Sequence, residues 1–450
     1  GKGCNGIYSA KKLTIKDDAT IRNAQGGIGK SYSGAGVFSD RDLEISGKAF
    51  IQNAKGGDSW MRGGDGIHST GILTIKDDAK IEKAQGGTGK SGGSGIRSGG
   101  NIDISQSAKI NTATGGDSAD GTGTGGDGIH SDGKFTISKS TSGDAWPNTI
   151  GTAQGGNGKS GGKGIFGKTV EIAVGIINQA KGGDSTGTSE DATGGAGISA
   201  SESLTISGNG WIEHATGGSA KDGKAGDGIH SDNTLKISGG RIDEATGGSA
   251  ESGAGGSGIH GGAGIVISDG IIKATGGSAN SGNGGAGIGV GETSSGTAKI
   301  SISGGNIKAT GGKGGAGIGG RKNQNGSVEI TGGVITQAEG SGGGAGIGGG
   351  SGGSATVKIE GNTTSIIMAT GQDGGAGIGS GSGSNGGTTI DISGGVIEQA
   401  TGIGGAGIGA GAESHGETQI NISGGTINYA IGQSGGAGIG GGSYSDSTAD

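Results

Sequence analysis

The stretch that decides the fold is Gly226-Asp-Gly-Ile-His-Ser-Asp-Asn-Thr-Leu-Lys-Ile-Ser-Gly-Gly-Arg-Ile-Asp-Glu-Ala-Thr-Gly-Gly248, in which polar or glycine-rich corners separate three short apolar pieces. The pieces lie around Ile229, Leu235/Ile237 and Ile242/Ala245. Leu235 and Ile237 are two residues apart, and this alternation is typical of a strand with one buried face. We therefore expect each piece to form a short β-strand.

The same unit recurs along the whole chain, with successive copies 29 to 36 residues apart. The first piece contributes the column Ile7, Val37, Ile67, Ile96, Ile129, Ile165, Ile198, Ile229, Ile259, Ile288, Ile318, Ile347, Ile378, Ile408 and Ile439. The second piece contributes Ile15, Ile45, Ile75, Ile104, Ile137, Ile172, Ile206, Ile237, Ile267, Ile302, Ile330, Ile359, Ile392 and Ile422. The third reads Ile-x-x-Ala-x-Gly, from Ile21/Ala24 to Ile427/Ala430, with one slip at Ile307/Ala309. Repetition at this period indicates a solenoid architecture.

About thirty residues, three strands and three corners per unit predict an all-β fold, a right-handed parallel β-helix (β-solenoid) of about 14 turns. Equivalent residues of successive turns would lie about 4.8 Å apart. We expect one domain over residues 1–450. Residues 1–260 carry charged corners and insertions, such as the one at 138–148, whereas residues 261–450 are built on a regular Gly-Gly-Ala-Gly-Ile-Gly unit.

Composition excludes several other classes. Gly makes up 125 of 450 residues without a Gly-X-Y period, which excludes collagen, and aligned isoleucine columns are not typical of disordered chains. The formal net charge is −7 and no basic stripe is present, so nucleic acid is not an expected partner. No apolar run is long enough for a membrane helix. Cys4 is the single cysteine, so no intrachain disulfide can form.

The residue after each first-piece Ile or Val is expected to point outward, because its neighbour points inward. In the first nine turns this position holds mostly planar or basic side chains, which would suit a ligand strip lying against sugar rings or another protein. The alternative is simple stacking of exposed planar groups. The strip comprises Tyr8, Phe38, His68, Arg97, His130, Phe166, His230 and His260, with Ser199 interrupting it.

From the tenth turn onward the same position is glycine, at Gly289, Gly319, Gly348, Gly379, Gly409 and Gly440. Glycine within a strand often marks the close approach of another backbone, so this column is expected to be available for lateral packing. The alternative is a tight corner that only glycine permits.

Aspartates in two settings are candidate metal ligands. Asp65, Asp127 and Asp227 each precede a histidine by three residues, as in Asp227-Gly-Ile-His230. Residues three apart on a strand face opposite sides, so one pair is not expected to close on an ion without a bend, although ligands from neighbouring turns could converge. Calcium would suit acidic corners, for which the alternative is a solvated Lys-Asp-Asp turn. These corners carry Asp17, Asp18, Asp77 and Asp78.

Catalytic patterns are not found in the sequence. A hydrolase of this fold needs two or three carboxylates close together in one groove, whereas Asp and Glu are scattered over different corners. The Gly-x-Ser-x-Gly motif of many esterases is missing as well. We therefore expect no enzyme activity and no cofactor other than calcium.

The repeat resembles those of known families. The segments Asp127-Gly-Ile-His-Ser-Asp-Gly-Lys-Phe-Thr-Ile-Ser138 and Asp227-Gly-Ile-His-Ser-Asp-Asn-Thr-Leu-Lys-Ile-Ser-Gly-Gly240 resemble repeats of clostridial β-helix proteins that bind acidic polysaccharide with calcium. The later Ile-Ser-Gly-Gly-x-Ile and Gly-Gly-Ala-Gly-Ile-Gly units resemble glycine-rich repeat tracts of large surface proteins of Firmicutes. The resemblance covers nearly all the chain. It implies a β-helix located outside the cell or at its surface.

The expected function is structural: a rod, stalk or filament subunit that stacks end to end. The chain begins inside the first piece and stops just after it, so the two ends are nearly in phase for a second copy. The alternative is a polysaccharide-binding module that uses the strip or the acidic corners. Ice binding is a third idea and rests on a single row of threonines, namely Thr114, Thr216, Thr246, Thr275, Thr310, Thr370 and Thr401.

Overall fold

The computed structural model describes residues 2–138, 149–280, 283–293 and 296–446, and within these ranges it contains strands and no α-helix. The fold is a parallel β-solenoid of about 14 turns, as the repeat predicted. The chain divides into two compact units, Gly1–Gly226 and Asp227–Asp450. The change of sequence texture near residue 260 therefore falls inside the second unit. The predicted insertion at 138–148 lies, except for Ser138, outside the described residues.

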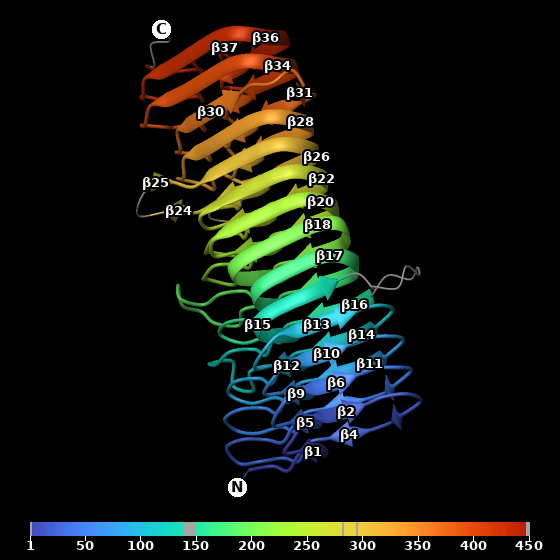
Figure 1. Cartoon of the computed structure of the whole chain (residues 1–450). Helices are drawn as coiled ribbons and strands as arrows, with labels where there is room; N and C mark the ends of the chain where they lie inside the picture. The colour runs from blue at the N-terminus through green and yellow to red at the C-terminus, as the bar shows by residue number, and fades with distance from the viewer. Residues whose placement is uncertain (1, 139–148, 281–282, 294–295, 447–450) are drawn as a thin grey trace. The chain divides into compact units, whose positions relative to one another are not determined.

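In the first unit the three pieces of each turn form three columns of strands (Figure 1). The first column consists of β1 (Ile7–Ser9), β5 (Val37–Ser39), β9 (Ile67–Ser69) and β12 (Ile96–Ser98), and the second of β2 (Leu13–Ile15), β6 (Leu43–Ile45), β10 (Leu73–Ile75) and β13 (Ile102–Ser105). The third consists of β3 (Thr20–Ile21), β4 (Ala24–Gln25), β7 (Phe50–Ile51), β8 (Ala54–Lys55), β11 (Lys80–Gln85), β14 (Lys109–Thr114) and β16 (Thr149–Gln154). Pieces merge into longer strands in β15 (Ile129–Ser138), β17 (Ile165–Lys181) and β18 (Ile198–Thr216).

In the second unit the first piece stays separate, whereas the second and third pieces mostly form one strand. The short strands are β19 (Ile229–Ser231), β21 (Ile259–Gly261), β23 (Ile288–Val290), β27 (Ile318–Gly319), β29 (Ile347–Gly348), β33 (Ile378–Gly379), β35 (Ile408–Gly409) and β37 (Ile439–Gly440). The long ones are β20 (Thr234–Thr246), β22 (Gly264–Thr275), β26 (Lys299–Lys313), β28 (Gly326–Ser341), β34 (Thr388–Ile403) and β36 (Thr418–Gln433). One turn is divided into β30 (Ala355–Ile359), β31 (Thr364–Ile366) and β32 (Ala369–Gly371), and β24 (Glu292–Thr293) pairs antiparallel with β25 (Gly296–Thr297).

The predicted columns are stacked residue on residue within each unit. In the first unit Ile75 pairs with Ile45 on one side and Ile104 on the other. In the second unit Ile302 pairs with Ile267 and Ile330 in the same manner. These isoleucines are at most 1% exposed, because the period-two alternation turns each of them toward the interior of its turn. Like-on-like stacking of Ile, Leu, Val and Ala therefore builds a core that needs few aromatic residues.

Buried serines end the first-column strands in the first unit. Ser39, Ser69 and Ser98 are fully buried, and each hydroxyl lies within hydrogen-bonding distance of one backbone carbonyl oxygen of its own turn and one of the preceding turn. The single hydroxyl hydrogen is thus satisfied inside the fold at the corner between two strands. The Ile-x-Ser pattern thus helps to close each turn. A search of the described residues finds no helix that could cross a membrane.

Candidate functional site

The structure places the predicted strip in one column within each unit. Tyr8, Phe38, His68, Arg97, His130 and Phe166 follow one another in register in the first unit, and His230 pairs with His260 in the second. Ring centroids lie 5.9 Å apart for Tyr8/Phe38, 4.9 Å for Phe38/His68, 4.8 Å for His130/Phe166 and 5.2 Å for His230/His260.

Exposure differs widely along this column. Tyr8 is 57% exposed, whereas His260 is only 8% exposed. The expected outward orientation therefore does not leave His260 open to solvent, because its ring stacks on His230 and its strand pairs with the following turn at Gly289. In the first unit the rings thus form a run of three at Tyr8, Phe38 and His68 and a pair at His130 and Phe166, and in the second unit His230 stacks on the buried His260.

Each Asp-Gly-Ile-His segment forms a local pair, which the sequence argument did not expect. The distance from the Asp carboxylate to His Nδ1 is 2.6 Å for Asp65/His68, 2.5 Å for Asp127/His130 and 2.7 Å for Asp227/His230. The strand begins only at the isoleucine, and the preceding glycine lies in a bend. The bend that the sequence argument required for such a pair to close is thus present between the aspartate and the strand, and the opposite-face rule does not apply to the aspartate.

The other carboxylate oxygen of each aspartate accepts a backbone N–H from the next turn. The donors are Ser94 for Asp65 at 2.7 Å, Lys163 for Asp127 at 2.6 Å and Ser257 for Asp227 at 2.6 Å. Burial raises the pKa of Asp65 and Asp127, but the hydrogen bond to His68 or His130, nearby positive charges and the backbone N–H together outweigh it, and both pKa values fall below the usual range. Each aspartate is thus an ionised link between two turns.

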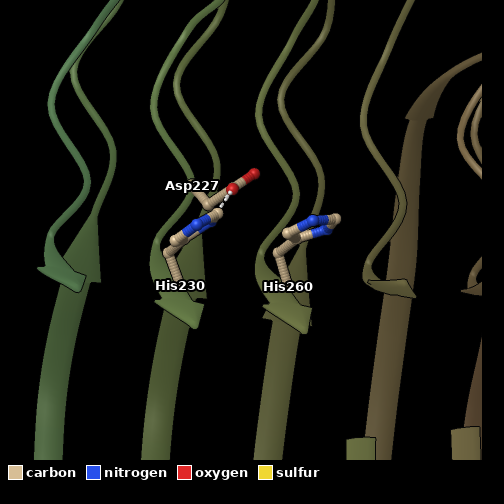
Figure 2. Close-up of side chains that lie close together, drawn as sticks. All are labelled: Asp227, His230 and His260. Carbon is tan, nitrogen blue, oxygen red and sulfur yellow. Dashed lines mark hydrogen bonds and ion pairs between the residues drawn. The ribbon is translucent and has the colours of Figure 1, made fainter. Parts of the chain in front are cut away.

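The pair in the second unit is part of a larger cluster. Nε2 of His230 lies 2.8 Å from a carboxylate oxygen of Asp232, so this imidazole is held between two aspartates. The guanidinium of Arg321 donates to Asp227 at 2.5 Å and to the hydroxyl of Ser257 at 2.9 Å. Figure 2 shows the imidazoles of His230 and His260 side by side on successive turns, with Asp227 bonded to the first.

The two imidazoles have opposite protonation preferences. Burial alone would lower the pKa of His230, but Asp227 and Asp232 raise it to about 9. Burial, aided by the nearby Arg321 cation, lowers the pKa of His260 to about 3. Burial would raise the pKa of Asp227, but the positive charge of Arg321 together with the neighbouring histidines holds this pKa well below the usual range. At neutral pH a protonated His230 therefore stacks on a neutral His260.

We expect His260 to make the protein less stable as the pH falls from 7 to 5. In the unfolded chain His260 takes up a proton below its ordinary pKa of 6.5, whereas in the folded chain it stays neutral down to about pH 3. At pH 5, which is 1.5 units below 6.5, the loss is on the order of 2 kcal/mol. His260→Phe removes this pH-dependent loss of stability. It also keeps a ring in the column, as Phe166 does next to His130.

The measurement is urea denaturation of the parent and of His260→Phe at pH 7 and pH 5, with a chelator present. The parent should lose about 2 kcal/mol more than the variant between the two pH values. Equal losses in both proteins would show that His260 takes up its proton in the folded state.

The predicted calcium corners lie apart from one another. Asp17 and Asp77 have φ values of 58° and 61°, so each occupies a left-handed corner. The turn that carries Gly47 separates them, and the carboxylate of Asp77 accepts the backbone N–H of Gly47 at 2.8 Å. Asp18 and Asp78 are exposed. The structure thus does not bring the four carboxylates together.

The glycine column of the later turns is buried under the chain's own backbone. Gly319 has a φ of 139°, and a Cβ placed there would lie 1.9 Å from the carbonyl oxygen of Gly348. The same geometry recurs at Gly348, Gly379 and Gly409, and all the glycines from Gly289 to Gly440 in this column are buried. The backbone that approaches is that of the next turn. The column is therefore a set of tight corners rather than an open face for lateral packing.

A polar groove of about 260 Å³ runs across several turns of the first unit. Glycine pairs such as Gly115-Gly116 and Gly155-Gly156 are among its lining residues. Amide, hydroxyl and charged side chains line its sides, namely Lys55, Asp58, Gln85, Thr88, Thr114, Asp117, Gln154 and Asn157. The carboxylate of Asp58 accepts from the backbone and hydroxyl of Thr88, and Asp117 accepts the backbone N–H of Asn157. The groove is thus built from successive turns.

Asp58 also borders an apolar surface groove of about 550 Å³. This second groove is lined by Ile28 and Trp60, both 78% exposed, and by Met61, which is 43% exposed. An exposed tryptophan beside polar side chains is a suitable surface for a ligand with apolar faces and polar edges. Trp60 lies in a corner outside the predicted strip, and no repeat position of the sequence marks it.

Several partners in the cluster around Asp227 were also missed. Asp232 could have been noticed from the segment Asp-Gly-Ile-His-Ser-Asp, which is present at Asp127–Asp132 as well. Arg321 lies 94 residues after Asp227, and no sequence signal connects the two.

Comparisons with protein-family models, curated proteins and solved structures found no match.

Proposed function

We propose that this protein is a structural element of an extracellular or cell-surface assembly, in which stacked solenoid turns serve as a stiff spacer. The observation that supports this best is the unbroken register of the isoleucine columns within each unit. Each turn buries its apolar face only against its neighbours, so turns can be added without a new core. The resemblance to repeat tracts of surface proteins points the same way.

Two measurements test this role. Antibodies against the chain should label intact, unpermeabilised cells of the source organism, and labelling confined to permeabilised cells would contradict a surface role. Deleting residues 378–407 joins Gly377 directly to Ile408 and removes one turn without breaking the repeat. The shortened protein should keep its strand content and melt as a folded protein, because successive turns are interchangeable. Loss of folding would contradict a modular spacer.

Stacking of copies is part of the same proposal. Turns pair through the same isoleucine columns throughout each unit, so the turns of a second copy would fit the same register. Negative-stain electron microscopy should show particles longer than one chain, and Ile422→Lys should shorten them. Single-chain particles for both proteins at high concentration would argue against stacking.

A second candidate function is the binding of a polysaccharide, favoured by the polar groove in the first unit. Its glycine pairs and its rows of amide and hydroxyl groups suit a hydroxyl-rich chain that crosses several turns. Exposed Trp60 next to Asp58 offers a stacking surface at one end.

The test is a glycan array probed with and without calcium. Gln85→Ala and Trp60→Ala should each weaken binding of any glycan that the parent retains. Gln25→Ala is the matched control, since Gln25 occupies the same column as Gln85 but does not line the groove. Binding that is equally sensitive to all three changes would place the ligand elsewhere. Dependence on calcium would implicate the acidic corners as well.

A further inference from the structure

Three potential metal ligands come together on two successive turns of the second unit. A carboxylate oxygen of Asp227, one ring nitrogen of His230 and one of His260 all lie within 4.8 Å of one another. No other group of three His, Cys, Asp or Glu ligands was found among the described residues. Asp227 lies just before β19, His230 lies within β19, and His260 lies within β21 (Figure 2).

His260 carries a polar atom that the protein itself does not satisfy. Its Nδ1 is buried and has no hydrogen-bond partner, and the residue is only 8% exposed. A buried polar group without a partner is rare and costs free energy, so it calls for an explanation. A ring nitrogen that makes no hydrogen bond within the protein is free to bind a metal ion.

The remaining contacts hold the ligands as metal sites usually do. A histidine that binds a metal commonly donates its second ring N–H to a carboxylate, and Nε2 of His230 lies 2.8 Å from Asp232. The second oxygen of Asp227 is held by Ser257 N and Arg321. Nδ1 of His230 and Oδ2 of Asp227, which bond to each other, are therefore the atoms that these contacts leave for a metal ion.

The other two Asp-His pairs provide a comparison inside the same chain. The position equivalent to His260 is Arg97 after His68 and Phe166 after His130. Neither arginine nor phenylalanine is a usual ligand for a metal ion. The convergence of three ligands therefore depends on His260.

We propose that Asp227, His230 and His260 bind one divalent transition-metal ion, with zinc the best match. Two imidazole nitrogens and one carboxylate form a typical three-ligand set for zinc, which leaves a fourth position for water or an external ligand. Calcium prefers oxygen ligands and fits this set poorly. The metal ion takes the place of the proton between Asp227 and His230, and this proton is released to solvent. Oδ2 of Asp227 and Nδ1 of His230 are 2.7 Å apart, and this distance must widen to roughly 3.3 Å to give metal–ligand distances of about 2.0–2.1 Å.

The test is isothermal titration of the full chain with zinc chloride at pH 7.5, in a Cys4→Ser background because Cys4 is an exposed thiol. We expect one zinc ion per chain and no heat with calcium or magnesium. His260→Phe should weaken zinc binding by roughly 100-fold or more, and Asp232→Asn by about 10–100-fold. His130→Phe is the matched control and should leave zinc binding unchanged.

Equal zinc affinity in the parent and in His260→Phe would overturn the proposal, as would no zinc binding by the parent. Cobalt(II) gives a readout that does not depend on the folding of a variant. Bound at this site in the parent, it should show the visible absorption of four-coordinate cobalt, with about one equivalent at saturation. Only the weak spectrum of hydrated cobalt would contradict an inner-sphere site.

Discussion

Replacing Ile75 with lysine is expected to unfold much of the first unit. Ile75 is fully buried between Ile45 and Ile104, which stack on it from the two neighbouring turns. The substitution removes a buried apolar side chain and places an ammonium group among isoleucines without a carboxylate partner. The loss should be on the order of 5 kcal/mol, a large part of the stability of a typical domain. Thermal melting and urea denaturation measure it.

Thr74→Lys is the matched control, because it puts the same charge one residue away on the other face of the strand. Thr74 pairs with Glu44 and Asp103, so the new ammonium group lies between two carboxylates. We expect stability equal to the parent or slightly above it. Comparable losses at positions 74 and 75 would contradict the assignment of inner and outer faces.

The second large effect is expected for Gly379→Ala in the second unit. Gly379 has a φ of 141°, which side chains of L-residues rarely adopt. A Cβ at this position would lie 1.9 Å from the carbonyl oxygen of Gly409, a backbone atom that cannot rotate away. The turns must separate locally to accept even one methyl group. We expect a loss of roughly 3–5 kcal/mol in denaturant unfolding.

Gly387→Ala serves as the control. Gly387 is exposed, and the nearest atom to its added Cβ is the carbonyl oxygen of Glu417 at 3.7 Å. The free energy of unfolding of the Gly387→Ala variant should stay within about 0.5 kcal/mol of that of the parent. If Gly379→Ala were as mild as this control, the glycine column would not be needed for close stacking of the turns.

The sequence was sufficient for the fold because one physical rule applies in every turn. The alternation of apolar and polar residues turns Ile75 and the isoleucines at the same position of other turns inward. Parallel stacking then places these equivalent residues above one another. The merging of the second and third pieces into strands such as β20 was not predicted. Some corners, like the one between Ile237 and Ile242, stay part of a continuous strand, and the local sequence does not distinguish them from corners that interrupt a strand.

The candidate site was predicted less well. The column position of His230 and His260 followed from the repeat, but their contacts did not. The sequence argument made the approach of Asp227 to His230 depend on a bend, and it could not tell that Asp227 lies in a corner before the strand, where that bend is present. The glycines after residue 288 suggested an approaching backbone, and the sequence could not tell that this backbone belongs to the next turn. Arg321 meets Asp227 only through the stacking of several turns.

The antiparallel hairpin of β24 and β25 has a practical consequence for engineering. It projects from a corner between β23 and β26, while Ile288 still pairs with Ile318 and Ile265 still pairs with Ile300. The turns on both sides therefore tolerate extra residues at this corner without a change of register. A foreign epitope grafted between residues 293 and 296 should be presented on a rigid support. This corner is the natural place to build a display scaffold from the chain.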